Sequence, residues 1–409
     1  MRVGFHRYRL LGKTVLLTND VGDHLFLSQE EYRGYLRGID PGQSLGSRLE
    51  AYGFLRHPSN PDAMTQSKLK TSLLSWTGPR AHICLIKRDG RAMSVDVARQ
   101  MVDFVFSAPG SRVNLELASW DESQWPCIWF IVQYARRKSE WESRPLQLTL
   151  RIAEPDISRE KLDFLRSHSV ILKAVLLVDG PPKREHLPMF PAEKVLCTVG
   201  SMASDPAAWI DLFKNTSTKW IELSPGPNLV NENEVVKFLD FYAQALDRMI
   251  GGKRSGGLRE EKTAAFLSRM RWNLPGQDVL GELAYGPDGG IYASEAGWAL
   301  QEKGIPLFRI GSLDKTRYGD LTQSDVVRGC VAASQGENQP LCFQCAYKPY
   351  CSLSPASNFL GQKTVWGRTP ESSLCSLHMG WLDLVFERLN NKKQCLILRN
   401  WKVDFLAVT

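Results

Sequence analysis

Four cysteines close to one end of the chain constrain its fold most. Cys342, Cys345 and Cys351 follow a C-x2-C-x5-C spacing, and Cys375 comes after 23 further residues. A C-x2-C pair lets two thiolates grip one metal centre from a single tight turn, and thiolates favour zinc or iron–sulfur clusters. Since the whole chain of 409 residues has only nine cysteines, this spacing predicts a metal site with four thiolate ligands.

The residues leave the metal and one ligand open. A zinc site suits the C-x2-C pair, but its second half is commonly another C-x2-C pair, which this sequence lacks. A [4Fe–4S] cluster suits the same four thiolates, so we expect one such cluster, with Zn2+ as the alternative. Cys330, 12 residues before Cys342, is a possible additional metal ligand, or a replacement for Cys375.

Composition places the chain among ordinary globular proteins. It is 43% apolar and 23% charged, and its length favours two or three domains. The net charge of +7 is mild for this size, so we expect no nucleic acid partner. No secretory signal opens the sequence, and no apolar run reaches the roughly 18–20 residues that span a bilayer. We therefore expect a cytoplasmic protein with no membrane association, in which clustered cysteines stay reduced and bind metal.

Residues 1–65 are expected to form a small α+β domain. Two strand-like runs, Thr14–Thr18 and His24–Leu27, flank a polar turn. Ser28-Gln29-Glu30-Glu31 is a capping box and predicts a helix start, and a second helix is expected over Gly46–Phe54. A polar, proline-broken linker at 57–62 follows.

Residues 70–255 alternate short apolar runs with longer helical segments. The expected strands are His82–Lys87, Arg112–Ala118, Leu146–Ile152, Ile171–Val178, Lys194–Val199 and Trp220–Leu223. The expected helices are Val95–Phe106, Pro126–Arg136, Ser158–Arg166, Asp205–Phe213 and Glu232–Ile250. Six such units in series predict an α/β fold with a parallel sheet, as either an open doubly wound sheet or a partial barrel. Ligands in such folds bind beyond the carboxyl ends of the strands.

Residues 256–409 are expected to form a third unit after the glycine-rich joint 251–257. A helix is expected over Arg259–Arg271, then a hairpin formed by Leu283–Tyr285 and Ile291–Ala293. The cysteine segment follows, and a helix near Leu377–Leu389 covers it.

These features together resemble a known family. The cysteine segment is similar to the SPASM domain, the cluster-binding extension of many radical SAM peptide-modifying enzymes, and the six units before it resemble the partial (β/α)6 radical SAM barrel. Leu16–His24, Gly78–Ile83 and Tyr347–Pro355 are most similar to the B-type maturase of the His-Xaa-Ser peptide system. The resemblance implies a radical-SAM-like barrel with a SPASM-like iron–sulfur domain.

The sequence departs from that family at the first barrel strand. The family carries C-x3-C-x2-C just after it, and three thiolates there hold the cluster that binds S-adenosylmethionine. Here Arg88–Ser94 contains no cysteine, and Cys84, inside the strand, reads as a small buried hydrophobe. The second strand ends in Ala118–Ser123 rather than a Gly-Gly-Glu-Pro segment. We therefore expect no SAM-binding cluster, no radical SAM activity and no catalytic residues.

The resemblance also implies which auxiliary cluster survives. SPASM domains commonly hold two, but here Ala293 and Pro355 stand where cysteines of the first are expected. The second keeps the four ligands named above. With every iron ligated, such a cluster has a structural or electron-relaying role.

Three functions follow as hypotheses. The first is a catalytically silent partner subunit of a peptide-modification (RiPP-type) system, which binds an active radical SAM maturase, the precursor peptide, or both; its N-terminal domain would add the peptide as an edge strand. The second is a single-cluster electron-transfer or redox-sensing protein. The third is an enzyme with non-radical chemistry in a polar pocket near Glu116, Asp121, Glu154, Asp179 and Glu222.

Overall fold

The computed structural model describes residues 3–55, 79–88, 90–118, 122–153, 157–182, 191–214, 216–226, 231–251, 257–271, 281–351 and 353–401. The predicted linker at 57–62 and most of the predicted joint at 251–257 lie outside these residues.

The N-terminal unit is an antiparallel three-stranded sheet followed by two helices. Its elements are β1 (Arg7–Leu11), β2 (Thr14–Thr18), β3 (His24–Ser28), α1 (Gln29–Leu36) and α2 (Gly42–Ala51). The capping box forms as predicted, since Glu31 N donates to Ser28 Oγ at 3.1 Å and Ser28 N to the Glu31 carboxylate at 2.6 Å.

Two details of this unit differ from the prediction. Helix α2 begins at Gly42, four residues before the predicted start, directly after Pro41 and with its first amide bonded to Asp40. Strand β1 was not predicted, because its arginines break the apolar alternation that marks a strand. Those arginines bind distant segments instead of solvent, so only the tertiary structure explains them.

A ten-stranded sheet forms the body of the molecule. Its spatial order is β12 (Arg259–Glu260), β11 (Trp220–Pro225), β10 (Lys194–Val199), β9 (Val170–Val178), β8 (Leu146–Ile152), β7 (Val113–Ala118), β4 (Ala81–Leu85), β13 (Glu282–Tyr285), β14 (Gly290–Tyr292) and β15 (Arg309–Ser312). The strands from β12 to β13 pair in parallel, and β14 and β15 are antiparallel. All six predicted strands are present within a few residues of their predicted bounds.

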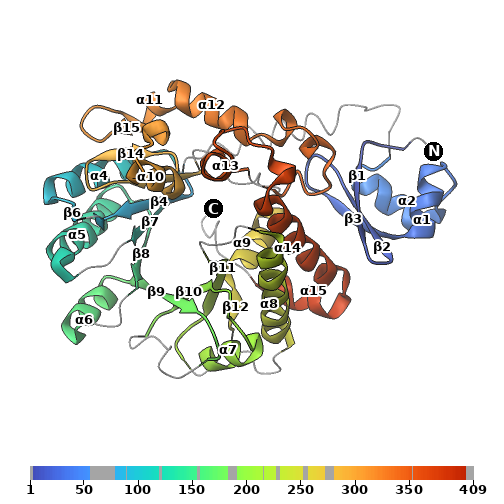
Figure 1. Cartoon of the computed structure of the whole chain (residues 1–409), viewed down its shortest axis with the longest axis horizontal. Helices are drawn as coiled ribbons and strands as arrows, with labels where there is room; N and C mark the ends of the chain where they lie inside the picture. Colours follow the sequence, from blue (N-terminus) through green and yellow to red (C-terminus); the bar gives the residue numbers. More distant parts are fainter. Residues whose placement is uncertain are drawn as a thin grey trace.

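The strand order runs in a single direction through the parallel part of the sheet from β4 to β12. Every step from β4 to β12 moves to the next strand in the same direction. Right-handed crossovers that never reverse put their helices on one face, whereas a doubly wound sheet reverses direction at a switch point. Figure 1 shows the strands following an arc, with α4 to α7 along its outer side. The crossover helices are α4 (Val95–Ser107), α5 (Trp125–Trp141), α6 (Arg159–Ser167), α7 (Pro206–Phe213) and α8 (Glu232–Gly251).

The remaining helices close the other side. They are α9 (Glu261–Arg271), α10 (Glu295–Glu302), α11 (Tyr318–Leu321), α12 (Asp325–Ser334), α13 (Pro355–Gln362), α14 (Ser373–Asn390) and α15 (Lys392–Leu398). The N-terminal unit lies beside α14 and α15 (Figure 1), and Arg9 of β1 forms a two-pronged ion pair with Asp383 of α14, at 3.0 and 2.6 Å. None of the helices in the described part of the chain has both the length and the apolar character that crossing a bilayer requires.

Candidate metal centre

The four predicted cysteines line one small cavity. Cys342 and Cys345 come from a 3-10 turn, Cys351 from the loop that follows, and Cys375 from the first turn of α14. The cavity has a volume of about 40 Å³, and apolar side chains such as Leu374 complete its wall. None of the four thiols is in a disulfide. The fold therefore gathers residues that are 33 positions apart in the sequence at one place.

Local backbone bonds explain this gathering. Cys345 N donates to Cys342 O at 3.1 Å, which closes the C-x2-C turn. Cys351 N donates to Tyr347 O at 2.8 Å, which brings the third cysteine back towards this turn. Ser372 caps α14 by accepting from Cys375 N at 3.1 Å, and this fixes the fourth cysteine at the helix start.

The electrostatics of the cavity suit a cationic guest. Burial raises the pKa of Cys351 to about 12, and the neighbouring thiols Cys345, Cys375 and Cys342 add to that rise. Burial, followed by Cys375 and Cys345, likewise raises the pKa of Cys342 to about 11. A metal centre supplies the positive charge that lets such thiols ionise. Four thiols are the donor type that binds zinc or an iron–sulfur cluster, although the described ranges contain no group of three or more Cys, His, Asp or Glu that could hold a metal ion.

His378 joins the cavity and was not predicted. Its Nδ1 lies 3.8 Å from Cys351 Sγ. Burial, assisted by the charge of Lys262, lowers its pKa to about 3, so it is neutral near pH 7. The spacing of Cys375 and His378, three residues apart on one helix, is the sequence signal that would have found it.

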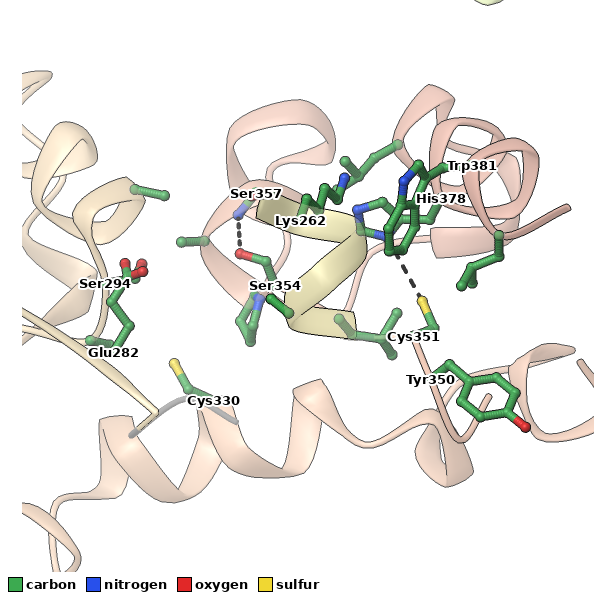
Figure 2. Close-up of a pocket in the computed structure, with 18 of the residues that line it drawn as sticks. Lys262, Glu282, Ser294, Cys330, Tyr350, Cys351, Ser354, Ser357, His378 and Trp381 are labelled. Carbon is green, nitrogen blue, oxygen red and sulfur yellow. Dashed lines mark hydrogen bonds between the residues drawn. The ribbon is translucent and has the colours of Figure 1, made fainter. Parts of the chain in front are cut away.

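Cys330 lies apart from the four thiols. It is buried in α12 and lines a second, larger cavity of about 530 Å³ (Figure 2). Ala293 and Pro355, the two positions where the resemblance expects cysteines, line this larger cavity as well. Cys351 and His378 line both cavities, so the two adjoin.

The N-terminal unit holds the cysteine loop from its outer side. Thr18 Oγ1 donates to Ala346 O at 2.7 Å, and Lys348 Nζ donates to Asp20 Oδ1 at 2.8 Å. Two further bonds cross the same boundary: Arg7 Nε to Phe343 O at 2.5 Å and Tyr350 OH to Gly22 O at 2.9 Å. The N-terminal unit therefore positions the loop between Cys342 and Cys351.

The carboxyl end of β4 is built differently. A short hairpin, β5 (Lys87–Arg88) and β6 (Arg91–Ala92), joins it to α4. Met93 N closes this hairpin by donating to Ile86 O at 2.8 Å. Cys84 is fully buried with its Sγ 3.7 Å from Met93 Sδ, which agrees with its prediction as a core residue. Cys127 and Cys197 are buried as well, whereas Cys395 is only half-buried.

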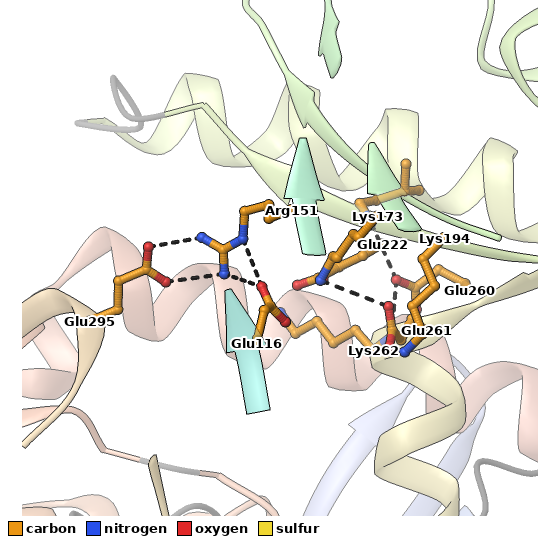
Figure 3. A network of polar contacts seen from close by, with 10 residues as sticks. Glu116, Arg151, Lys173, Lys194, Glu222, Glu260, Glu261, Lys262 and Glu295 are labelled. Atoms are coloured by element: carbon orange, nitrogen blue, oxygen red, sulfur yellow. Dashed lines mark hydrogen bonds and ion pairs between the residues drawn. The ribbon is translucent and has the colours of Figure 1, made fainter. Parts of the chain in front are cut away.

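Ion pairs fill the concave side of the sheet (Figure 3). Arg151 donates to Glu116 at 2.7 Å and to Glu295 of α10 at 2.8 Å. Further along the arc, Lys173 donates to Glu222 at 2.7 Å, and Lys194 pairs with Glu261. These ion pairs thus join five strands of the sheet, β7 to β11, to the helices α9 and α10.

These contacts bear on the five acids named for non-radical chemistry. Glu116 and Glu222 are held in the ion pairs of Figure 3. Asp179 accepts from Met202 N at 2.8 Å and fixes the loop after β10. Asp121 and Glu154 lie outside the described residues.

Comparison with known proteins finds similarity of fold alone. No protein-family model matches the chain, and no curated protein matches it in sequence. Solved structures that match include native anSMEcpe with bound AdoMet, at a TM-score of 0.58 and 13% identity over 77% of this chain and 100% of that one. His6-tagged anSMEcpe with bound AdoMet gives 0.58 and 13% over 78% and 99%, and native anSMEcpe with bound AdoMet and the Cp18Cys peptide gives 0.58 and 13% over 77% and 99%. The chain therefore has a radical SAM-like fold.

Proposed function

We propose that this chain is a catalytically silent relative of the radical SAM/SPASM peptide maturases, with a partial (β/α)6 barrel and one auxiliary [4Fe–4S] cluster. Cys342, Cys345, Cys351 and Cys375 hold the cluster. The protein acts as a partner subunit that binds a precursor peptide, an active maturase, or both.

A single observation carries the proposal. Four free thiols meet at one cavity in the C-terminal segment, while the loop after β4 offers none. A fully thiolate-ligated cluster supplies one-electron transfer and cross-links the segment that holds it. Apolar side chains surround the thiols and so limit the access of water; they include Leu374, Met379 and Leu382.

The N-terminal unit supports the binding role. β1 is an edge strand of its sheet, and Tyr8 and Leu10 on it are 54% and 56% exposed. Exposed apolar side chains on an edge strand suit an extended peptide that adds to the sheet. One of the structurally similar anSMEcpe complexes contains a peptide, which is compatible with peptide binding by this fold.

Metal analysis tests the cluster. After anaerobic purification we expect about four irons and four sulfides per chain, since one [4Fe–4S] cluster contains that number. About one zinc and no iron per chain would instead indicate a zinc site, the alternative to the cluster. Roughly seven or more irons would place a second cluster in the barrel and overturn the claim of lost radical chemistry.

Peptide capture tests the binding role. Deletion of residues 1–55 is expected to abolish co-purification with a co-expressed precursor peptide or maturase. The double variant Tyr8→Ser/Leu10→Ser is expected to weaken it at least tenfold without changing the iron content. Unchanged capture by both variants would contradict the partner role and would favour the electron-transfer alternative, which a reversible EPR signal on reduction would identify.

A further inference from the structure

The 530 Å³ cavity beside the cysteine site has the size of a small-molecule site. One side is formed by β13 and the start of α10, with Glu282 and Ser294 (Figure 2). The opposite side carries Lys262, His378 and Trp381 from α9 and α14. Apolar groups such as Phe308 and Leu382 form much of the remaining wall. The cavity therefore has an acidic end and an apolar body.

The lysines that pair with the acidic wall of this cavity do not themselves line the cavity. Glu222, Glu261 and Glu282 line the cavity, whereas Lys173 and Lys194 do not. Lys173 neutralises Glu222 from the side of the sheet, and Lys194 does the same for Glu261. One oxygen of Glu261, Oε2, is buried without a hydrogen bond, and Lys173 Nζ is 4.0 Å from it.

Glu282 differs from most neighbouring acids because it forms no ion pair with a described residue. The described carboxyls in and beside the network are Glu116, Glu222, Glu260, Glu261, Glu282 and Glu295, and the cations are Arg151, Lys173, Lys194 and Lys262. Glu116, Glu222, Glu261 and Glu295 form ion pairs, which leaves two carboxyls without an ion pair to any described residue. Glu260 is one, and it is accommodated by Tyr242 OH and Thr263 N at 2.5 Å each, away from the cavity.

Glu282 is the other, and it faces the cavity. One of its oxygens accepts from Glu295 N at 3.0 Å, and it forms no ion pair with any described residue. Burial raises its pKa, and the charges of Glu295 and Glu116 raise it further, while that backbone bond and Arg151 oppose the rise. A cation that enters the cavity would therefore pair with the Glu282 carboxylate.

We propose that the cavity binds a small ligand with a primary ammonium group and an apolar body, whose nitrogen pairs with Glu282 and whose body packs on Phe308 and Leu382. The ammonium group donates to the Glu282 carboxylate. This site is independent of the proposed function, because it requires neither the cluster nor a peptide partner.

Calorimetry on the purified full chain tests the proposal with two matched probes, hexan-1-amine and hexan-1-ol. We expect the amine to bind the wild type at least tenfold more tightly than the alcohol. Glu282→Gln should remove the tenfold advantage, whereas Asp325→Asn, at an almost fully exposed acid on α12, should keep it.

A second variant separates the site from the fold. Ala293→Phe fills the cavity while leaving Glu282 in place, and it should abolish binding of both probes. Circular dichroism melts establish that each variant is folded. Equal affinity of the wild type for amine and alcohol would overturn the proposal, as would amine binding unchanged in Glu282→Gln or in Ala293→Phe. Iron content, measured on the same samples, reports the cluster separately.

Discussion

The carboxyl end of β4 and the cysteine loop are the two places where this fold is expected to hold clusters, and their chemistry is opposite. Both groups of β4 are already partnered: Cys84, near its carboxyl end, contacts Met93, and His82, near its amino end, lies 2.6 Å from Tyr285 OH through its Nδ1. At the cysteine loop, four thiols line one cavity, and neighbouring thiols add to the rise that burial causes in the pKa of Cys342 and of Cys351. Contacts between side chains occupy the first place, whereas the second encloses a cavity of about 40 Å³.

The same contrast extends to the concave side of the sheet. There, buried charges are matched by ion pairs across neighbouring strands, with Lys173 only 7% exposed. Removing one partner of such a pair is costly, because the other charge is left unpaired. We therefore expect the ion pairs of the sheet layer to stabilise the fold, whereas Glu282, which forms no ion pair with a described residue, is available to a ligand.

The largest expected effect is loss of metal. Cys351→Ser removes one of the four thiolates, and we expect iron to fall from about four per chain to below one. The readout is iron and sulfide analysis after anaerobic purification. Cys84→Ala and Cys330→Ser are matched controls that should retain the full iron content. Loss of iron in Cys84→Ala would show that the β4 region also takes part in holding the metal.

The next effect concerns the sheet interior. Lys173→Met leaves Glu222, whose side chain is 33% exposed, without its cation, and we expect a loss of about 2 kcal/mol, between the values for exposed and for fully buried pairs. Urea unfolding measures this loss. Lys219→Met, which breaks an exposed pair with Glu193, should cost less than about 1 kcal/mol. The double variant Lys173→Met/Glu222→Gln should recover part of the stability; if it does not, the charge pair is not the cause.

A pH effect follows from His82, which is 1% exposed. Burial, with a smaller contribution from Arg144, lowers its pKa to about 3, against an ordinary value near 6.5. The unfolded chain then binds the extra proton first, so stability is full above about pH 6.5 and falls towards pH 3. Between pH 7 and 5 this residue alone should cost about 2 kcal/mol.

The measurement is the urea midpoint of the wild type and of His82→Gln at both pH values. We expect the wild type to lose more stability than the variant on acidification, since other titrating groups are common to both. Equal losses would mean that His82 is not held neutral.

The smallest effect concerns the clamp between the N-terminal unit and α14. Arg9→Ala removes the ion pair with Asp383, which is partly exposed, and should cost about 1 kcal/mol. Hydrogen exchange in residues 7–28 should accelerate more than exchange in the sheet. Arg159→Ala, at an almost fully exposed pair, should leave both unchanged. Uniform acceleration throughout the molecule would show that the clamp is not local.

The sequence determined the local elements and the donor set. The capping box at Ser28, the apolar runs of the six strands and the C-x2-C spacing each depend on interactions between near neighbours, so they are readable from a few consecutive residues. The absence of cysteines in Arg88–Ser94 is equally local, and with it the expectation of no second cluster.

Only the tertiary structure decided what depends on residues far apart in the chain. It separated Cys330 from the four-thiol cavity, added His378 to that cavity, and explained β1 through arginines that bind Phe343 and Asp383. It also left Glu282 without a cation among the described residues, a property that exists only once β13, α9 and α10 meet. Charge balance and cavity walls arise from contacts across hundreds of positions, and no spacing within the sequence encodes them.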